Sequence, residues 1–218
     1  MFISFSGTDG AGKSTQIQLL SEFFQKSGRR YKIIWARGGY TPIFSLIKKL
    51  LQIVLNKKIP KSGPSDSRSR VFRKKYIAEL WLKIAIADLF LFYGVYARLL
   101  ALFGFVVVCD RYIEDTEIDF KRNFPNNFDS SSLLWRLVRL ITPTAKHSFL
   151  LHVPVGITLM RSKQKNEPFP DSAETLQFRL DSYLNEDYFP NSKYIKIDCQ
   201  GEPNKIHSLI IKHVTNSF

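Results

Sequence analysis

Short apolar runs alternate along the chain with longer segments whose apolar residues recur at helical spacing. The short runs predict five strands, over residues 3–6, 31–35, 104–109, 147–153 and 194–198. The longer segments predict helices over residues 16–26, 42–56, 71–103, 131–141, 174–184 and 206–214, and a further helix that begins at 156–161. Strands separated by helices in this way predict an α/β fold, with a five-stranded parallel sheet flanked by helices on both faces.

The chain has 218 residues, of which 44% are hydrophobic, and this predicts one domain over residues 1–218. Residues 57–70, rich in Ser, Pro and Arg, predict a polar connector. The most apolar region, residues 76–109, is interrupted by charged residues that include Lys83, Asp88 and Arg98, and each uncharged run is shorter than the roughly 18 residues that span a membrane. A buried core helix is therefore predicted there, and a peripheral membrane contact is the alternative.

The first strand leads directly into G-x-x-x-x-G-K-[ST], the pattern of a phosphate-binding loop. Backbone N–H groups of such a loop surround the phosphates of ATP, and the helix that follows adds partial positive charge. Lys13 is expected to reach the β- and γ-phosphates, and the Ser14 hydroxyl to bind Mg²⁺. The alternative is a glycine turn without a ligand, which would need neither side chain. The predicted ATP-binding residues are Gly7, Thr8, Asp9, Gly10, Ala11, Gly12, Lys13, Ser14 and Thr15.

Polar residues also follow two of the other predicted strands. Asp110 comes directly after the strand at 104–109 and is expected to contribute to the Mg²⁺ shell. Arg111 is expected to point toward phosphate at the same edge of the sheet, and Arg37, after the second strand, is expected at the edge of the crevice. The alternative for Asp110 and Arg111 is an Asp-Arg pair that only caps a helix.

A basic segment near residues 161–173 has the composition of a mobile lid. It carries Arg161, Lys163 and Lys165, and cations on a lid can neutralise charge on a transferring phosphate. The alternative is an ordinary solvated basic loop.

Charge and cysteine content restrict the binding partners and the cellular compartment that we expect for this protein. The 32 Lys and Arg residues exceed the 19 Asp and Glu residues, so the net charge of +13 favours anionic partners. Cys109 and Cys199 each end a predicted strand and are expected to be core residues, not disulfide or metal ligands. A cytoplasmic location is the corresponding expectation.

The order of these motifs resembles the thymidylate kinase family over nearly the whole chain. The resemblance rests on the loop at residues 5–15, Arg37-Gly38-Gly39 with Thr41-Pro42, Asp110-Arg111-Tyr112, the basic segment, and a following helix with Arg179 and Tyr183. It implies transfer of phosphate from Mg·ATP to a nucleoside monophosphate, usually dTMP, by a homodimer. It also implies that Asp9 approaches the acceptor sugar and that Arg37 and Arg111 bind the acceptor phosphate. Arg161, Lys163 and Lys165 are the candidate catalytic cations, because this loop carries Gly10 and Ala11 where some relatives carry a cation.

Three departures from the family pattern fall on the acceptor side. Leu89 replaces the arginine that contacts thymine, Ser6 replaces a frequent glutamate, and residues 115–121 replace a pattern of small residues followed by Ala-Tyr-Gln. Two alternatives therefore stay open. One is a kinase of the same fold for a sugar, sugar phosphate or lipid-linked metabolite. The other is a nucleotide-binding regulatory or nucleic-acid-associated protein without kinase activity, although nucleic-acid binding is not the leading expectation.

Overall fold

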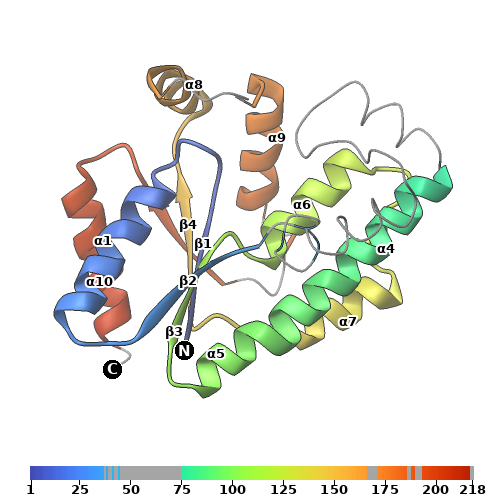
Figure 1. Cartoon of the computed structure of the whole chain (residues 1–218). Helices are drawn as coiled ribbons and strands as arrows, with labels where there is room; N and C mark the ends of the chain where they lie inside the picture. Colours follow the sequence, from blue (N-terminus) through green and yellow to red (C-terminus); the bar gives the residue numbers. More distant parts are fainter. Residues whose placement is uncertain are drawn as a thin grey trace. The chain divides into compact units, whose positions relative to one another are not determined.

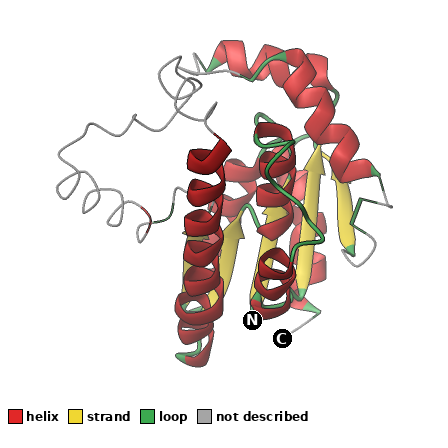
Figure 2. Ribbon diagram, turned by 90° about the vertical axis from the view of Figure 1, so that its right-hand side faces the viewer, coloured by secondary structure: helices red, strands yellow, loops and turns green. Residues whose placement is uncertain are grey.

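Five parallel strands form one sheet in the computed structural model, which describes residues 1–36, 38, 41, 44, 75–165, 171–185, 188–189 and 193–216 (Figures 1 and 2). The order across the sheet is β2-β3-β1-β4-β5. The strands are β1 (Phe2–Ser6), β2 (Tyr31–Trp35), β3 (Val106–Asp110), β4 (His147–His152) and β5 (Tyr194–Asp198). The predicted α/β fold and its five strands are confirmed, with small shifts at the strand ends.

The helices of the described residues include every predicted one except that at 42–56. That segment, apart from Phe44, and the connector at 57–70 lie outside the described residues. The helices are α1 (Lys13–Lys26), α4 (Lys75–Leu91), η1 (Phe92–Ala97), α5 (Arg98–Leu102), α6 (Ile113–Asn123), α7 (Leu133–Ile141), α8 (Val155–Gln164), α9 (Ala173–Leu184) and α10 (Pro203–Thr215).

Helix α6 is an element that the sequence analysis missed. Its apolar residues are few, so the hydrophobic spacing gives little signal. The charges do give one, because Glu114 and Asp115 lie in its first turn and Lys121 and Arg122 in its last. This distribution complements the helix dipole and is typical of helix ends.

Two compact units make up the chain. The first contains residues 1–35, 100–115 and 144–218, and therefore the whole sheet; the second contains residues 36–99 and 116–143. The single domain over 1–218 stays a prediction.

The core of the first unit forms where α1 and α10 pack on one face of the sheet (Figure 1). Alternate strand residues such as Ile3, Phe5 and Phe149 point into this core. Val107 and Leu150, whose side chains lie on the opposite face of the sheet, are buried too. Burial on both faces explains why these strands are nearly continuous apolar runs. It also leaves the carboxyl ends of the strands as the edge where polar side chains gather.

The second unit has an aromatic core. Trp135 of α7 is fully buried, and its ring centroid lies 5.0 Å from that of Phe128 and 5.7 Å from that of Phe120. Gly38 is required beside this cluster, because a Cβ there would lie 2.2 Å from Cζ of Phe120. Close packing, which sequence alone does not reveal, therefore accounts for this glycine.

The apolar helix at residues 75–102 corrects one expectation. Helices α4, η1 and α5 are continuous over Lys75–Leu102, and by length and composition this helix could cross a membrane, a test that core helices of soluble proteins also meet. The sequence argument counted only uninterrupted runs, whereas a spanning helix tolerates an occasional charge. Only 39% of its most apolar window is buried, so the expectation of a buried core helix is correct for one face and wrong for the other.

Candidate functional site

The phosphate-binding loop joins β1 to α1 and has the backbone that its glycines allow. Gly7, Gly10 and Gly12 all have positive φ, at 136°, 79° and 96°. A Cβ on Gly7 would lie 2.0 Å from the carbonyl oxygen of Leu151, so no other residue fits there. No side chain caps α1, and its first turn contains no acidic residue. The N–H groups of that turn can therefore bind an anion, as the sequence predicted.

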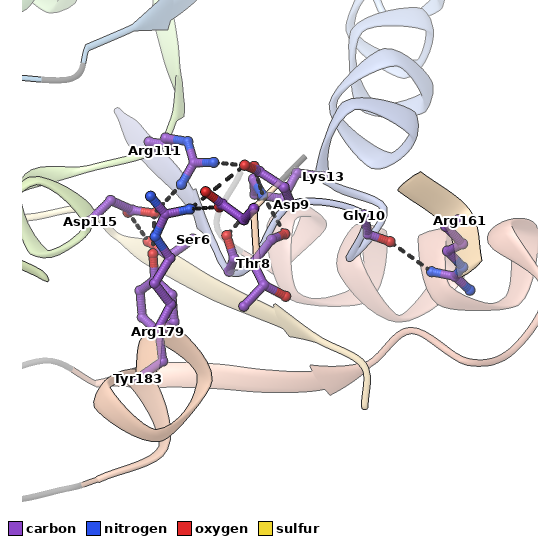
Figure 3. Close-up of polar contacts among 12 residues, drawn as sticks. Ser6, Thr8, Asp9, Gly10, Lys13, Arg111, Asp115, Arg161, Arg179 and Tyr183 are labelled. Carbon is purple, nitrogen blue, oxygen red and sulfur yellow. Dashed lines mark hydrogen bonds and ion pairs between the residues drawn. The ribbon is translucent and has the colours of Figure 1, made fainter. Parts of the chain in front are cut away.

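Lys13 lies in the first turn of α1 and folds back over the loop (Figure 3). Its Nζ donates hydrogen bonds to the carbonyl oxygens of Gly7 and Thr8, both at 2.8 Å, and the side chain is only 7% exposed. Burial, with the Arg111 guanidinium as a second cause, lowers the pKa of Lys13 from 10.5 to about 8. Phosphate oxygens would stabilise the charged form of this ammonium group.

Asp9 lies beside cations from three parts of the first unit, one of which is the predicted acceptor residue Arg111. Its carboxylate accepts a hydrogen bond from Arg111, lies 3.9 Å from Nζ of Lys13, and lies 3.7 Å from Nη1 of Arg179 (Figure 3). Arg111 has a left-handed backbone, with φ of 75°, and its N–H donates to the carbonyl oxygen of Phe5. This conformation is uncommon outside glycine and directs the guanidinium toward the loop. Arg179, on α9, was named in the family resemblance but was given no role there, and the structure places it in the site.

A second carboxylate, that of the buried Asp115, lies on the other side of Arg111. It accepts hydrogen bonds from Ser6 Oγ and Tyr183 Oη, both at 2.6 Å (Figure 3). The sequence marked Ser6 and Asp115 separately as departures from the family pattern. Only the parallel pairing of β1 with β3 places them in contact, which is why sequence reasoning did not join them.

The predicted magnesium ligands suit a metal that is held mainly through phosphates. Ser14 is exposed at the start of α1, and Asp110 ends β3. Burial raises the pKa of the Asp110 carboxyl, and a bound cation would oppose this rise. The described residues contain no cluster of three or more Asp, Glu, His or Cys side chains that could enclose a metal. One hydroxyl and one carboxylate fit Mg²⁺, which keeps several waters and uses phosphate oxygens as ligands.

The predicted lid cations divide into two kinds. Arg161, on α8, donates to the carbonyl oxygens of Gly10 at 3.0 Å and Cys199 at 2.9 Å, so it supports the phosphate loop (Figure 3). Lys163 and Lys165 are exposed at the end of α8. Residues 166–170 of the predicted lid, and Arg37, lie outside the described residues.

The two cysteines lie where the sequence predicted. Cys109 and Cys199 are both buried free thiols. Burial raises the pKa of Cys199 to about 11 and raises that of Cys109 further, so neither is a ready nucleophile.

Curated relatives match this chain from end to end, although no family model matches it. A thymidylate kinase of Sulfurihydrogenibium sp. (strain YO3AOP1) is 27% identical over 213 residues, which cover 96% of this chain and 94% of the relative. A thymidylate kinase of Geotalea daltonii is 27% identical over 218 residues, covering 99% and 90%. The chain is a relative of the thymidylate kinases. The predicted resemblance is therefore confirmed.

The solved thymidylate kinase of Ehrlichia chaffeensis agrees with the fold. It is 20% identical, superposes with a TM-score of 0.56, and the match covers 98% of both chains. The comparisons support an ATP-dependent nucleotide kinase, as the motifs predicted.

Proposed function

We propose that the protein transfers the γ-phosphoryl group of ATP to the phosphate of dTMP, giving ADP and dTDP. The observation that carries the proposal is the cluster of Lys13, Asp9 and Arg111 at the carboxyl ends of β1 and β3. The curated relatives named thymidylate kinase, matched over nearly the whole chain, supply the acceptor.

The reaction needs alignment and charge neutralisation more than a dedicated base. The attacking group is a phosphate oxygen of dTMP, which is largely ionised at neutral pH because its second pKa is about 6. It forms a bond to the γ-phosphorus, and the bond from that phosphorus to the bridging oxygen of ADP breaks. Lys13 and the first turn of α1 hold the ATP phosphates, while Arg111 and Arg37 hold the acceptor phosphate against charge repulsion.

Mg²⁺, held by Ser14 and Asp110 together with phosphate oxygens, would neutralise charge on the β- and γ-phosphates. Lys163 and Lys165 would add positive charge from the lid, and Arg161 would keep the loop in shape. Closure of residues 161–173 over the phosphates would exclude water and limit hydrolysis of ATP.

The same proposal includes a cytoplasmic homodimer. Four leucines of α7 are exposed although they are apolar, at positions Leu133, Leu134, Leu137 and Leu140. A surface of this kind is typical of an interface. Sedimentation of the purified protein tests it: a mass near twice 25.3 kDa is expected, and a monomer at micromolar concentration would refute it.

The catalytic proposal is tested by ATP consumption in the presence of Mg²⁺ and a panel of acceptors. The panel contains dTMP, dUMP, the other nucleoside monophosphates, sugars and sugar phosphates. Selective turnover of dTMP is expected. ATP binding without turnover of any nucleotide would refute the proposal.

One observation favours a second candidate, a kinase of this fold for a less polar acceptor. Leu89, which replaces the thymine-contacting arginine of the family, is fully buried, and Phe120, within the segment that replaces its Ala-Tyr-Gln pattern, packs against Gly38. Neither side chain can donate a hydrogen bond to a base. Turnover of a lipid-linked metabolite, added to the panel, in preference to dTMP would favour this candidate.

A further inference from the structure

The buried carboxylate of Asp115 uses its two oxygens for different partners. Oδ2 accepts hydrogen bonds from Ser6 Oγ at 2.6 Å and from the backbone N–H of Tyr112 at 2.8 Å. Oδ1 accepts from Tyr183 Oη at 2.6 Å and lies 3.5 Å from Nη1 of Arg111 (Figure 3). One side chain thus joins the end of β1, the turn after β3, and α9.

Arg111 lies between two carboxylates of different character. Its Nη2 donates to Asp9, and its Nη1 faces Asp115. Asp9 is 39% exposed in the phosphate loop, where ligands bind, whereas Asp115 is fully buried at the start of α6. An acceptor phosphate that binds Arg111 would compete with Asp9 but would not reach Asp115. Asp115 can therefore hold the guanidinium in place before and after the acceptor binds.

We propose that Asp115 is a positioning residue for phosphoryl transfer. Through Oδ1 it orients the guanidinium of Arg111, and through Oδ2 it fixes the last residue of β1, from which the phosphate loop starts. Tyr183 extends the same contact to α9. This inference rests on the proposed function in one respect, namely that Arg111 binds the acceptor phosphate.

The chemistry of the amide makes Asp115→Asn a selective test. The N–H of Tyr112 can only donate, so the amide oxygen must take the place of Oδ2. The amide NH₂ then takes the place of Oδ1. Tyr183 can rotate its hydroxyl to accept from that group, but the Arg111 guanidinium can only donate, so it loses the contact with residue 115 and keeps the one with Asp9. The substitution keeps the size of the side chain and the contact with β1, so the protein should still fold.

Steady-state kinetics with dTMP and ATP varied separately give the first readout. Asp115→Asn is expected to raise KM for dTMP about tenfold or more and to leave KM for ATP within about twofold. The matched control is Asp129→Asn, because Asp129 is an exposed carboxylate bonded to Ser131 outside the cluster. If both KM values change together, or only the unfolding midpoint changes, Asp115 is structural and the proposal is wrong.

A double-mutant cycle separates the two oxygens. Tyr183→Phe acts on Oδ1, so it should raise KM for dTMP in the wild-type background and add almost nothing to Asp115→Asn. Ser6→Ala acts on Oδ2, so its effect should add to that of Asp115→Asn. Full additivity of Tyr183→Phe would refute the assignment of Oδ1 to Arg111.

A second readout is independent of the acceptor. Hydrogen exchange at the Arg111 guanidinium can be followed by NMR, with Arg111→Lys used to assign the signal. Asp115→Asn is expected to accelerate this exchange about tenfold, and an unchanged rate would overturn the proposal. If dTMP is not turned over by the wild-type protein, the proposed function fails while this measurement still decides the role of Asp115.

Discussion

The two compact units each bury charged side chains, but they arrange them differently. In the second unit, Glu117 of α6 is enclosed by donors, with Trp135 Nε1 at 2.9 Å, Arg139 Nη1 at 3.0 Å and Lys121 Nζ at 3.0 Å. In the first unit, Lys13 is bonded to two carbonyl oxygens, and its ion pair with Asp9 spans 3.9 Å. The Glu117 carboxylate is fully paired, with a donor on each oxygen, whereas Lys13 of the loop cluster has carbonyl oxygens as its nearest partners and can take a further anion. A buried charge marks a candidate site when its partners leave it short of counter-charge.

The largest effect that follows from this difference is expected for Lys13→Ala. Removing the buried ammonium group should lower turnover by about 10²–10³-fold or more, because no other described side chain takes its place over the loop. A coupled assay of ADP release measures this. Lys26→Ala, at the exposed end of α1, removes the same charge and should have almost no effect. Turnover at the wild-type rate in Lys13→Ala would mean that catalysis occurs elsewhere.

Arg111→Ala is expected to have the next largest effect, and it should affect the acceptor more than ATP. A loss of about 2–4 kcal/mol in transition-state stabilisation corresponds to a fall of roughly 30- to 10³-fold in kcat/KM for the acceptor. The control is Arg136→Ala, an exposed arginine on α7. If ATP affinity alone fell, the assignment of Arg111 to the acceptor phosphate would be wrong.

Substitutions of the basic residues at the end of α8 are expected to have moderate effects on two different kinetic parameters. Arg161→Ala should raise KM for ATP about tenfold, because the Gly10 carbonyl of the loop loses the hydrogen bond that Arg161 donates. The double variant Lys163→Ala with Lys165→Ala should lower kcat and change KM for ATP little. Steady-state kinetics of both variants with ATP varied test the division, and equal effects on both parameters would contradict it.

Glu117→Gln tests the fully paired carboxylate of the second unit. It should lower the free energy of unfolding by about 1–3 kcal/mol, because two cations lose a buried counter-charge. KM values for both substrates should stay within about twofold of wild type. Urea denaturation and steady-state kinetics measure the two quantities, and a selective change in acceptor KM would assign Glu117 to the site instead.

The smallest expected effects concern pH, and the two units should respond with opposite sign. The pKa of Lys13 is about 8 in the folded protein and 10.5 in the unfolded chain. Between pH 8 and 10.5 the unfolded state therefore binds more protons, and the free energy of unfolding should rise with pH. Burial raises the pKa of Asp88 from 3.8 to about 6, so stability should fall as pH rises between these values. Urea denaturation across both ranges tests the signs. Lys13→Met and Asp88→Asn should each flatten one slope and leave the other unchanged.

Much of the first unit could be predicted from the sequence because local signals determine it. The phosphate loop has a fixed glycine spacing, and the strands of a sheet buried on both faces are continuous apolar runs. Arg111 was predicted at the carboxyl edge because it follows a strand of the sheet, whereas the place of Asp9 beside the acceptor came from the family resemblance.

The contacts that complete the cluster depend on packing and were not predictable in this way. Arg179 was named as part of the family resemblance, but nothing in the spacing of α9 predicted that its side chain is buried beside Asp9. Asp115 was visible only as a departure from the family pattern, and its contact with Ser6 requires the pairing of β1 with β3. Likewise, the exposed apolar face of the helix at Lys75–Leu102 could not be told from its buried face by composition.

The central place of β1 in the sheet constrains how the protein can be made. The strand is synthesised before its two neighbours, β3 and β4, which end only at residues 110 and 152. At about 5–20 residues per second, roughly 7–30 seconds pass between the synthesis of β1 and the end of β4. Until β3 is made Phe2–Ser6 has neither partner, and until β4 is made it has only one, so the phosphate loop lacks the complete sheet that holds it. Nascent chains stalled before β4 should therefore bind chaperones and lack affinity for ATP, while full-length chains should acquire both the sheet and the nucleotide site in one late step.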